Sequence, residues 1–267
     1  MDSQITELKD VPESLSKLVI NYCDPLFLTE RQRANEKNVE KVNGTLTYIN
    51  YKGQLWGVTN AHVSDMENSQ RKLTLYGFGT QPICLSEVNA HGGFRALRQN
   101  GETSRPDIAI IKICETVKKV HFNSNSRKSI CLDEWKYPDH SESLSTPVAF
   151  GFPTIHKTED KLQTQSPLVL VTGHTSRNWS FDNEKITLHA GLPNDSDYFL
   201  SGISGGPIFH AEDRESNPLI IGIVFEGLPS KPEAESPLFG LNNVVVTGYT
   251  LTPDIFDGWL RELRFVD

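Results

Sequence analysis

Short apolar or alternating stretches recur from residue 44 onward, and they constrain the fold of this chain more than any other feature. They read GTLTYINY, KLTLYGF, DIAIIKI, TPVAFGF, LVLVTGH, KITLHA, PLIIGIVF and NVVVTGYTL. Loops rich in glycine, proline, serine, asparagine and aspartate separate them. Many short strands with few helical patterns between them are typical of a β-sandwich or a β-barrel, so we predict an all-β fold.

Turn and cap residues predict a hairpin near the start of this region and a helix at its end. GTLTYINY and LWGVT flank the turn KGQ, as the strands of a hairpin would. Thr252 is a capping residue and Pro253 takes the first helical position. The apolar residues that follow with helical spacing are Ile255, Phe256, Trp259, Leu260 and Leu263. We expect an amphipathic helix over 253–267 that packs on the β body, and a crossover between two halves of the chain in the polar stretch 132–146.

The charge balance argues against a nucleic-acid partner. The 267 residues carry 34 acidic and 26 basic side chains, for a net charge of −8, and lysine and arginine form no stripe. No apolar run is long enough to cross a membrane, and the first residues are acidic and polar, unlike a signal peptide. We therefore expect a cytoplasmic protein with neither a nucleic-acid nor a membrane partner.

The four cysteines do not have the spacing of a metal site. Cys23, Cys84, Cys114 and Cys131 form no CxxC motif and no cysteine–histidine ligand pattern. We expect no metal and no cofactor. In a reducing cytoplasm all four are expected to be free thiols.

Residues 201–209 read SGISGGPIF and place three glycines around Ser204. Glycine is costly in regular structure, so the stretch is either a tight hairpin or a turn that presents Ser204 as a nucleophile. It also fits the GxSxG elbow of α/β-hydrolases, which requires a strand, a turn and a helix, with an acid and a histidine downstream. Only His210 follows Ser204, and it lies on an apparent strand. The α/β-hydrolase interpretation therefore fails.

A serine hydroxyl needs an adjacent base, and a third group must orient that base. His62 lies in WGVTNAHV, where the chain leaves a predicted strand, and Asp107 lies in SRPDIAIIKI, directly before the most apolar strand of the first half. Taken singly, His62 is more simply a capping or surface residue and Asp107 a turn residue. All three lie at strand boundaries in the order His62, Asp107, Ser204, and that combination favours a catalytic triad.

VTNAHV, DIAIIKI, GISGGPIF and PLIIGIVFEG resemble the histidine, aspartate, nucleophile and cleft-strand motifs of chymotrypsin-like (trypsin-like) serine proteases. The resemblance runs from about residue 40 to the C-terminus. It implies two antiparallel β-barrels of chymotrypsin type with the site in the cleft between them. On this basis residues 1–39 form an N-terminal extension, with or without a first strand. The first barrel spans 40–135, the second 136–252, and the C-terminal helix 253–267.

The resemblance also implies the chemistry. His62 would be the general base, Asp107 would hold its imidazole, and Ser204 would be the nucleophile. The backbone amides of Gly202 and Ser204 would form an oxyanion hole. The implied activity is that of a serine endopeptidase with an acyl-enzyme intermediate, acting on protein or peptide substrates. The alternative is a catalytically silent trypsin-fold module that binds or regulates another protein.

Three positions depart from the secreted members of the family. Ile203 stands where those members have an aspartate that pairs with a new N-terminus, and Val63 stands where they have a cysteine. Phe225 stands where a serine often supports the catalytic aspartate. The chain thus looks closer to bacterial or organellar intracellular members. That likeness implies a regulated protease, and we expect control through a partner, ligand or substrate that orders cleft loops such as 190–203. Because Ile203 replaces the acid that a new amine would neutralise, we expect no activation by N-terminal cleavage.

The specificity pocket is read from residues on either side of the cleft. Tyr198 and Phe199 are expected near the pocket base, unless they are simply core strand residues. The expected wall consists of Val224, Phe225, Glu226 and Gly227, with Glu226 at the rim. Because neither base position carries a carboxylate, the sequence predicts cleavage after apolar or small residues and not after lysine or arginine.

Overall fold

The structure is a computed structural model of the chain. The described residues are 19–30, 39–40, 44–68, 71–75, 83–89, 92–98, 102–122, 127–136, 147–154, 158–160, 163–166, 168–175, 180, 184–191, 200–210, 219–228 and 243–266. Tyr198 and Phe199 lie outside them, as does most of the 190–203 loop.

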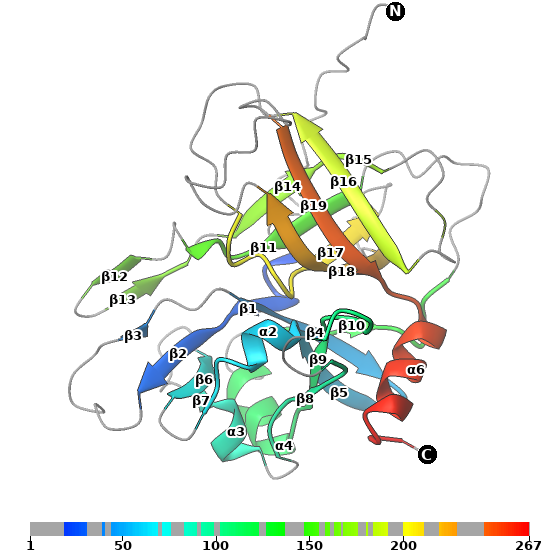
Figure 1. Ribbon diagram of the computed structural model, residues 1–267. Coiled ribbons are helices and arrows are strands. Elements are labelled where there is room, and N and C mark those ends of the chain that lie inside the picture. The colour runs from blue at the N-terminus through cyan, green and yellow to red at the C-terminus, as the bar shows by residue number, and fades with distance from the viewer. Residues whose placement is uncertain are drawn as a thin grey trace, which may run out of the picture.

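Two sheets make up the first barrel, which occupies the lower half of Figure 1. One has six strands in the order β1-β4-β5-β9-β8, with β10 beside β4. Their bounds are β1 Cys23–Pro25, β4 Thr45–Tyr51, β5 Gln54–Thr59, β8 Arg95–Ala96, β9 Ala109–Lys112 and β10 Ile130–Cys131. The other sheet has the order β3-β2-β6-β7. Its strands are β2 Phe27–Glu30, β3 Val39–Glu40, β6 Arg71–Leu75 and β7 Ile83–Cys84. Only Leu26 separates β1 from β2, so the chain passes directly from one sheet to the other.

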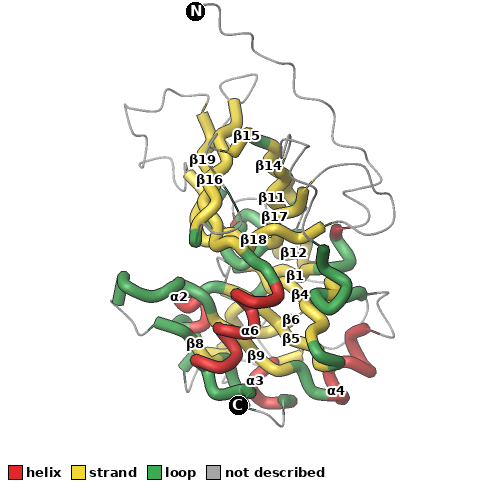
Figure 2. The backbone as a smooth tube through the Cα atoms, turned by 90° about the vertical axis from the view of Figure 1, so that its right-hand side faces the viewer, coloured by secondary structure: helices red, strands yellow, loops and turns green. Residues whose placement is uncertain are grey.

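The second barrel is a seven-stranded sheet above the first in Figures 1 and 2, in the order β14-β11-β17-β18-β19-β16-β15. Contacts between β14 and β16 bring its two ends together. The strands are β11 Pro147–Gly151, β14 Val169–Thr172, β15 His174–Thr175, β16 Lys185–Gly191, β17 Pro207–His210, β18 Leu219–Leu228 and β19 Asn243–Thr250. A separate hairpin joins β12 Thr158–Asp160 to β13 Gln163–Gln165. The two-barrel, all-β prediction is confirmed.

One strand pair departs from the antiparallel expectation. Residues Ile130 and Cys131 of β10 pair in parallel with Ile49 and Asn50 of β4. This pair lies where the chain approaches the crossover. There, Leu132 donates its amide to the Asn50 carbonyl at 2.9 Å, which extends the pairing by one residue.

Within the part of the chain that the structure describes, the short helices belong to the first barrel. They are α2 Ala61–Ser64, α3 Leu85–Val88, α4 Glu115–Val117 and the π-helical turn η2 Lys118–Phe122. Each follows a strand within a few residues and buries at least one side chain against the sheets. The helix that carries His62, α2, begins directly after β5 and thus at the edge of the barrel.

Three apolar cores hold the molecule together. One fills the first barrel and includes Leu46, Tyr48 and Leu73, all fully buried. Another fills the second barrel around Ile186, Ile208 and Val246. The third joins residues of both barrels to the terminal helix, among them Ile110, Val148, Phe150, Phe209, Phe256 and Leu260. This shared core fixes the two barrels against each other and therefore fixes the residues at their boundary.

The predicted hairpin forms, with Tyr51 opposite Gln54. Lys52 and Gly53 make the two-residue turn at φ values of 51° and 71°. Two successive positive φ values are typical of the primed turns whose twist matches a right-handed pair of strands. The glycine is therefore needed at a place where most side chains would be strained.

The terminal helix α6 runs over Pro253–Glu262, capped by Thr252, whose Oγ1 accepts from the Ile255 amide at 3.3 Å. Although it follows the second barrel in sequence, it packs on the first. The Phe256 ring meets the Tyr51 and Trp56 rings edge-on, at centroid distances of 5.6 and 6.4 Å. Figure 2 shows α6 beside the first barrel, in the lower half of the molecule. Because the helix follows β19 and packs on the first barrel, it links the two barrels.

The four cysteines are free thiols. Burial, together with the neighbouring Asp24 carboxylate, raises the pKa of the Cys23 thiol. In the described part of the chain, no helix has the length and apolar character needed to cross a membrane. No cluster of histidine, cysteine or acidic side chains there has the arrangement of a metal site.

Candidate active site

His62 is carried by α2, which starts as the chain leaves β5. Ala61 and Val63 on either side of it are fully buried, and this turns the imidazole outward, where it is 37% exposed. Val63 fills the space beside Gly44, so close that a Cβ at Gly44 would lie 2.5 Å from Val63 Cγ1. The packing of Val63 thus anchors the helix, at the position where the sequence analysis expects a cysteine in secreted proteases.

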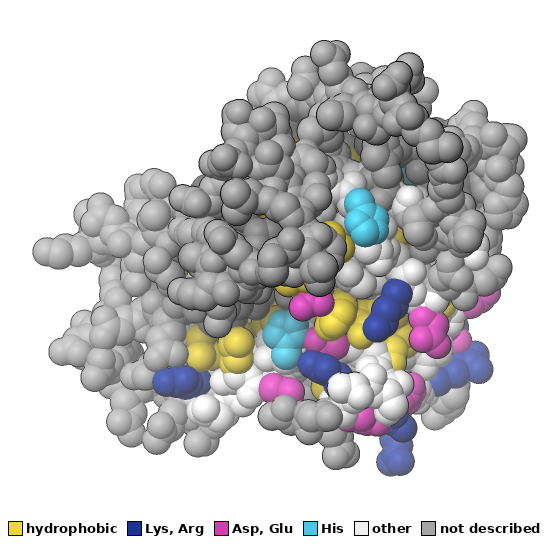
Figure 3. Space-filling model, turned by 45° about the horizontal axis from the view of Figure 1, so that its top comes forward, with side chains coloured by type: hydrophobic (Ala, Val, Ile, Leu, Met, Phe, Trp, Pro, Cys, Tyr) yellow, Lys and Arg dark blue, Asp and Glu magenta, His cyan; other side chains and the backbone are white. Residues whose placement is uncertain are grey.

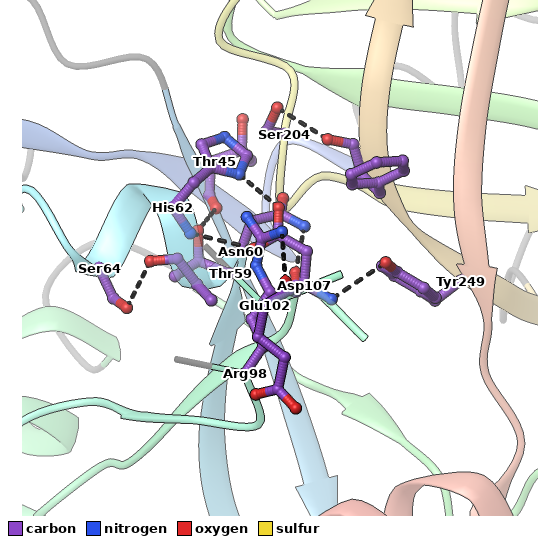
Figure 4. A network of polar contacts seen from close by, with 12 residues as sticks. Thr45, Thr59, Asn60, His62, Ser64, Arg98, Glu102, Asp107, Ser204 and Tyr249 are labelled. Carbon is purple, nitrogen blue, oxygen red and sulfur yellow. Dashed lines mark hydrogen bonds and ion pairs between the residues drawn. The ribbon is translucent and has the colours of Figure 1, made fainter. Parts of the chain in front are cut away.

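Asp107 lies just before β9 and contacts His62 twice (Figure 4). Its Oδ2 lies 2.6 Å from His62 Nδ1, and its Oδ1 accepts the His62 backbone N–H at 3.0 Å. The Asp107 backbone is also fixed, because its carbonyl accepts from Asn60 Nδ2 at 2.6 Å and its amide donates to the Tyr249 hydroxyl at 3.0 Å. The carboxylate, 1% exposed, therefore sets both the orientation and the tautomer of the imidazole.

The net effect of this environment lowers the pKa of Asp107. Burial alone would raise it, because a charged carboxylate loses water. The hydrogen bonds from the His62 side chain and backbone, and the positive charges of His62 and Arg98, outweigh that penalty. Asp107 is accordingly an anion wherever His62 has to act as a base.

The Ser204 loop is no surface hairpin, because Gly202, Ile203, Gly205 and Gly206 are all buried. Gly202 and Gly205 have φ values of +105° and +88°, in the region that favours glycine. A Cβ at Gly205 would lie 2.2 Å from the Thr45 carbonyl oxygen, and one at Gly202 would lie 2.7 Å from the Phe152 carbonyl oxygen. The glycines are required by both conformation and space.

Threonines of the first barrel hold this loop of the second. Thr45 donates its amide to the Ser204 carbonyl at 2.8 Å and its hydroxyl to the Gly202 carbonyl at 3.0 Å. Thr47 donates its hydroxyl to the Gly205 carbonyl at 2.7 Å. Thr59 donates to the Thr45 carbonyl at 2.8 Å and stands three residues before His62. Hydrogen bonds therefore join the segment that carries Ser204 to the segment that carries His62.

The amides of the loop fall into two sets. The N–H groups of Ile203, Gly205 and Gly206 donate to the carbonyls of Leu200, Val224 and Ile203, respectively. Within the described residues, the N–H groups of Gly202 and Ser204 meet no acceptor. These are the two amides that the sequence proposes as the oxyanion hole.

Ser204 itself turns its hydroxyl toward the second barrel. Its Oγ donates to the Phe225 carbonyl at 3.2 Å, and among the described residues no hydrogen bond joins it to His62. The structure thus brings His62 and Asp107 into contact and holds Ser204 on the neighbouring loop. Hydrogen bonds between a nucleophile and its base are often loose before substrate arrives.

The proposed cleft wall divides into core and exposed positions. Val224 and Gly227 are buried, and Val224 belongs to the core of the second barrel. Glu226 is exposed, and the half-buried Phe225 ring lies 5.4 Å from the Tyr249 ring and 5.6 Å from Lys185 Nζ. Only Phe225 and Glu226 therefore offer side chains to a ligand. The space-filling view in Figure 3 shows histidine, acidic, basic and hydrophobic side chains gathered near the centre of one face.

Two partners of Asp107 escape sequence reasoning. Arg98 Nε lies 2.8 Å from Asp107 Oδ1, and Tyr249 accepts the Asp107 amide. Tyr249 lies in β19, and nothing in the sequence of that strand indicates a contact with Asp107. Arg98 lies in none of the sequence motifs, and only the folded structure brings it next to Asp107.

One comparison with known proteins identifies the family of this chain. No curated protein matches this chain. One solved chain, described by the words "Aromatic interactions drive the coupled folding and binding of the intrinsically disordered Sesbania mosaic virus VPg protein", shares 14% identity at a TM-score of 0.42. The superposition covers 86% of this chain and 91% of that one. The family described as Trypsin matches residues 44–242, which is most of the chain and includes His62, Asp107 and Ser204. The chain therefore belongs to the trypsin family and has a serine-protease-type fold.

Proposed function

We propose that this protein is a serine endopeptidase that hydrolyses peptide bonds through Ser204, His62 and Asp107. The observation that carries the proposal is the double contact of the buried Asp107 carboxylate with the ring and the backbone of His62. A surface histidine needs no such partner, whereas a catalytic base must be held in one tautomer and stabilised when it takes up a proton.

The reaction would begin when the Ser204 hydroxyl leaves the Phe225 carbonyl and donates to His62 Nε2. Its oxygen then attacks the scissile carbonyl while His62 takes the proton. The resulting imidazolium gives that proton to the leaving amine as the carbon–nitrogen bond breaks. Water, deprotonated by the same imidazole, attacks the acyl-enzyme ester. His62 then returns that proton to Ser204 Oγ as the ester bond breaks and the carboxylic acid product leaves. Asp107 stays ionised throughout and stabilises the imidazolium.

The free amides of Gly202 and Ser204 would receive the oxyanion of the tetrahedral intermediate. Preorganised donors of this kind are effective because they need no rearrangement as charge develops. Removing one typically costs about 2.7–4 kcal/mol of transition-state stabilisation. The Gly202 N–H shares a peptide plane with the Ser201 carbonyl, which accepts from the Thr154 amide at 2.7 Å. The Ser204 N–H shares one with the Ile203 carbonyl, which accepts from the Gly206 amide at 2.9 Å. These hydrogen bonds support the role, because they fix the planes that contain the two N–H groups.

The substrate would be a protein or peptide lying along β18. Phe225 and Glu226 are the described side chains placed to contact it, and Val224 and Gly227 would contribute backbone. Tyr198 and Phe199 remain the proposed pocket base, with apolar or small residues preferred before the scissile bond. The free thiols support action in a reducing compartment such as the cytoplasm. A regulatory protein partner would act on the loop 190–203.

Labelling by a fluorophosphonate tests the proposal, because the reagent phosphorylates an activated serine. We expect the native protein to be labelled on the peptide that contains Ser204. The Ser204→Ala variant should not react, and His62→Ala should react far more slowly. Ser201→Ala is the matched control, since Ser201 lies in the same loop and should be dispensable for labelling.

The alternative, a catalytically silent binding module, gives the opposite result. If the folded native protein is not labelled, or is labelled equally well after Ser204→Ala, then the endopeptidase proposal is wrong. Retained folding of each variant is checked by circular dichroism.

A further inference from the structure

Asp107 has a second charged partner besides His62. Arg98 Nε lies 2.8 Å from Asp107 Oδ1, on the carboxylate oxygen that does not face the imidazole nitrogen (Figure 4). The Nε–H group is not aligned on that oxygen, so the contact is a close ion pair and not a directed hydrogen bond. The carboxylate thus lies between an imidazole on one oxygen and a guanidinium on the other.

The fold holds Arg98 at this place. Arg98 follows β8, and the preceding residue, Leu97, is 2% exposed and donates its amide to the Ile108 carbonyl at 2.9 Å. At the far end of the side chain, Nη1 donates to the Glu102 carbonyl at 3.4 Å. The Arg98 side chain is only 22% exposed. Backbone anchoring and two side-chain contacts therefore fix the guanidinium against Asp107.

We propose that Arg98 is a positioning residue for the serine-protease reaction, a role that rests on the proposed function of the triad. It holds Oδ1 so that Oδ2 stays directed at His62 Nδ1, and its charge offsets part of the charge of the carboxylate. Among the described residues, no side-chain hydroxyl donates to the Asp107 carboxylate, so Arg98 is the side chain that holds Oδ1 beside the His62 amide.

The charge of Arg98 has a definite consequence for His62. A guanidinium beside Asp107 reduces the net negative potential at the imidazole and therefore disfavours the imidazolium. Neutralising Arg98 should therefore move the acid limb of a reaction that needs neutral His62 to higher pH, by roughly half a pH unit, because Arg98 acts through the carboxylate and from a partly solvated position.

Other charged groups near this pair do not reverse the expected direction. Asp65 lies at the end of α2 with an exposed side chain. Its pKa is raised because the carboxylate loses part of its water and lies near Asp107, and the positive charges of Arg98 and His62 offset only part of this. Glu102 pairs through Oε1 with Arg105 Nε at 3.5 Å, and Glu184 and Lys185 lie on the Tyr249 side. All of these groups remain when Arg98 is substituted, so the change isolates the guanidinium.

The test compares Arg98→Gln, Arg98→Lys and Arg105→Gln by their pH profiles of inactivation with a fluorophosphonate. Arg105 is the matched control, because it lies in the same region, has the same charge, and pairs with Glu102 and Glu262 and not with Asp107. For Arg98→Gln we expect the acid limb of the second-order rate constant to move to higher pH, with a slower maximal rate and unchanged reagent affinity. Arg98→Lys should recover most of the native limb, and Arg105→Gln should match the native protein.

A second measurement keeps this inference separable from the proposed function. The imidazole of His62 is titrated by NMR in the native protein and in Arg98→Gln or, if that variant does not fold, in Arg98→Met, which also removes the charge. A native protein that is not labelled at Ser204 refutes the endopeptidase and leaves the titration as the test of Arg98. An acid limb or a titration midpoint that is unchanged, or moves to lower pH, in Arg98→Gln overturns the inference. So does an equal shift in Arg105→Gln.

Discussion

At the scale of a single residue, Thr45 lies at the contact between the two barrels. Its hydroxyl donates to the Gly202 carbonyl and accepts from the Phe152 amide at 3.1 Å, and it is fully buried. Valine has the same shape but offers neither contact. We predict that Thr45→Val lowers the free energy of unfolding by about 1–3 kcal/mol, because two buried backbone groups lose a partner. We also predict slower fluorophosphonate labelling, because the carbonyl of Gly202 is released.

Urea titration and labelling rates check this prediction, with Thr74→Val as the control. Thr74 is also a buried threonine of the first barrel, but its hydroxyl donates to the Lys72 carbonyl, away from the Ser204 loop. Thr74→Val should affect stability without slowing the labelling. Equal labelling rates for Thr45→Val and the native protein would show that the hydroxyl does not position the loop.

The lowered pKa of Asp107 makes a prediction about stability and pH. Because the folded-state pKa lies below the unfolded value of about 3.9, the ionised carboxylate stabilises the fold at pH values above it. That contribution is lost as the pH falls through the folded-state pKa. We therefore expect the native protein to be more stable than Asp107→Asn near neutral pH, and this advantage to shrink below pH about 4. Urea unfolding over this range measures it, and an advantage that grows toward acid pH would contradict the account.

The order of motifs along the chain predicted the pairing of His62 with Asp107, but it could not predict every neighbour of Asp107. His62 and Asp107 could be paired from the sequence because the resemblance supplies their roles, and the structure places them 2.6 Å apart. Arg98 could not be found this way. Its contact depends on a bend after β8 that brings a residue nine positions before Asp107 back onto the carboxylate, and no local pattern indicates that bend.

Among the elements, α6 has the clearest structural role. It follows the second barrel but buries Phe256 completely against aromatic rings of β4 and β5. Replacing Phe256 with alanine removes these contacts and leaves a cavity. We predict a loss of about 3–5 kcal/mol in the free energy of unfolding. Because α6 joins the barrels, the second barrel should lose stability together with the first in one urea transition.

Arg261→Ala serves as the control for α6, since the Arg261 side chain is 64% exposed and its ion pair among the described residues is with Asp257 on the same helix. We expect that change to alter stability by less than about 0.5 kcal/mol. A Phe256→Ala protein as stable as Arg261→Ala would show that the packing of α6 on the first barrel does not stabilise the fold.

Local sequence signals predicted which elements form better than they predicted what those elements pack against. The hairpin and the capped helix follow from Gly53, Thr252 and Pro253, whose backbone requirements act within a few residues. The docking of α6 on the first barrel does not, because helix periodicity shows which face is apolar but not what covers it. The parallel pairing of β10 likewise depends on contacts between segments about eighty residues apart in sequence.

At the scale of the whole molecule, Ile203 bears on how the protein is activated. Its side chain is 2% exposed and packs in the core of the second barrel, against Gly151 and Gly227. A charged amine inserted beside it would lose its water without gaining a carboxylate partner, which is costly. We predict that activity does not need cleavage that creates a new N-terminus.

Extending or acetylating the N-terminus tests this directly. The blocked, uncleaved protein should be labelled by the fluorophosphonate at the same rate as the unblocked protein. Labelling that appears only after proteolysis, and disappears when the new terminus is acetylated, would contradict the prediction and would require a different partner for the amine.

The central claim is peptide-bond hydrolysis by Ser204, and a peptide-library cleavage assay tests it most directly. The library is incubated with the native protein, with Ser204→Ala, with His62→Ala and with the double variant, and new termini are identified by mass spectrometry. The account predicts internal cleavages by the native protein that each single change removes almost entirely. The double change should add little, because the two residues act as a unit. An absence of cleavage by the native protein, or cleavages that persist in Ser204→Ala, would contradict it.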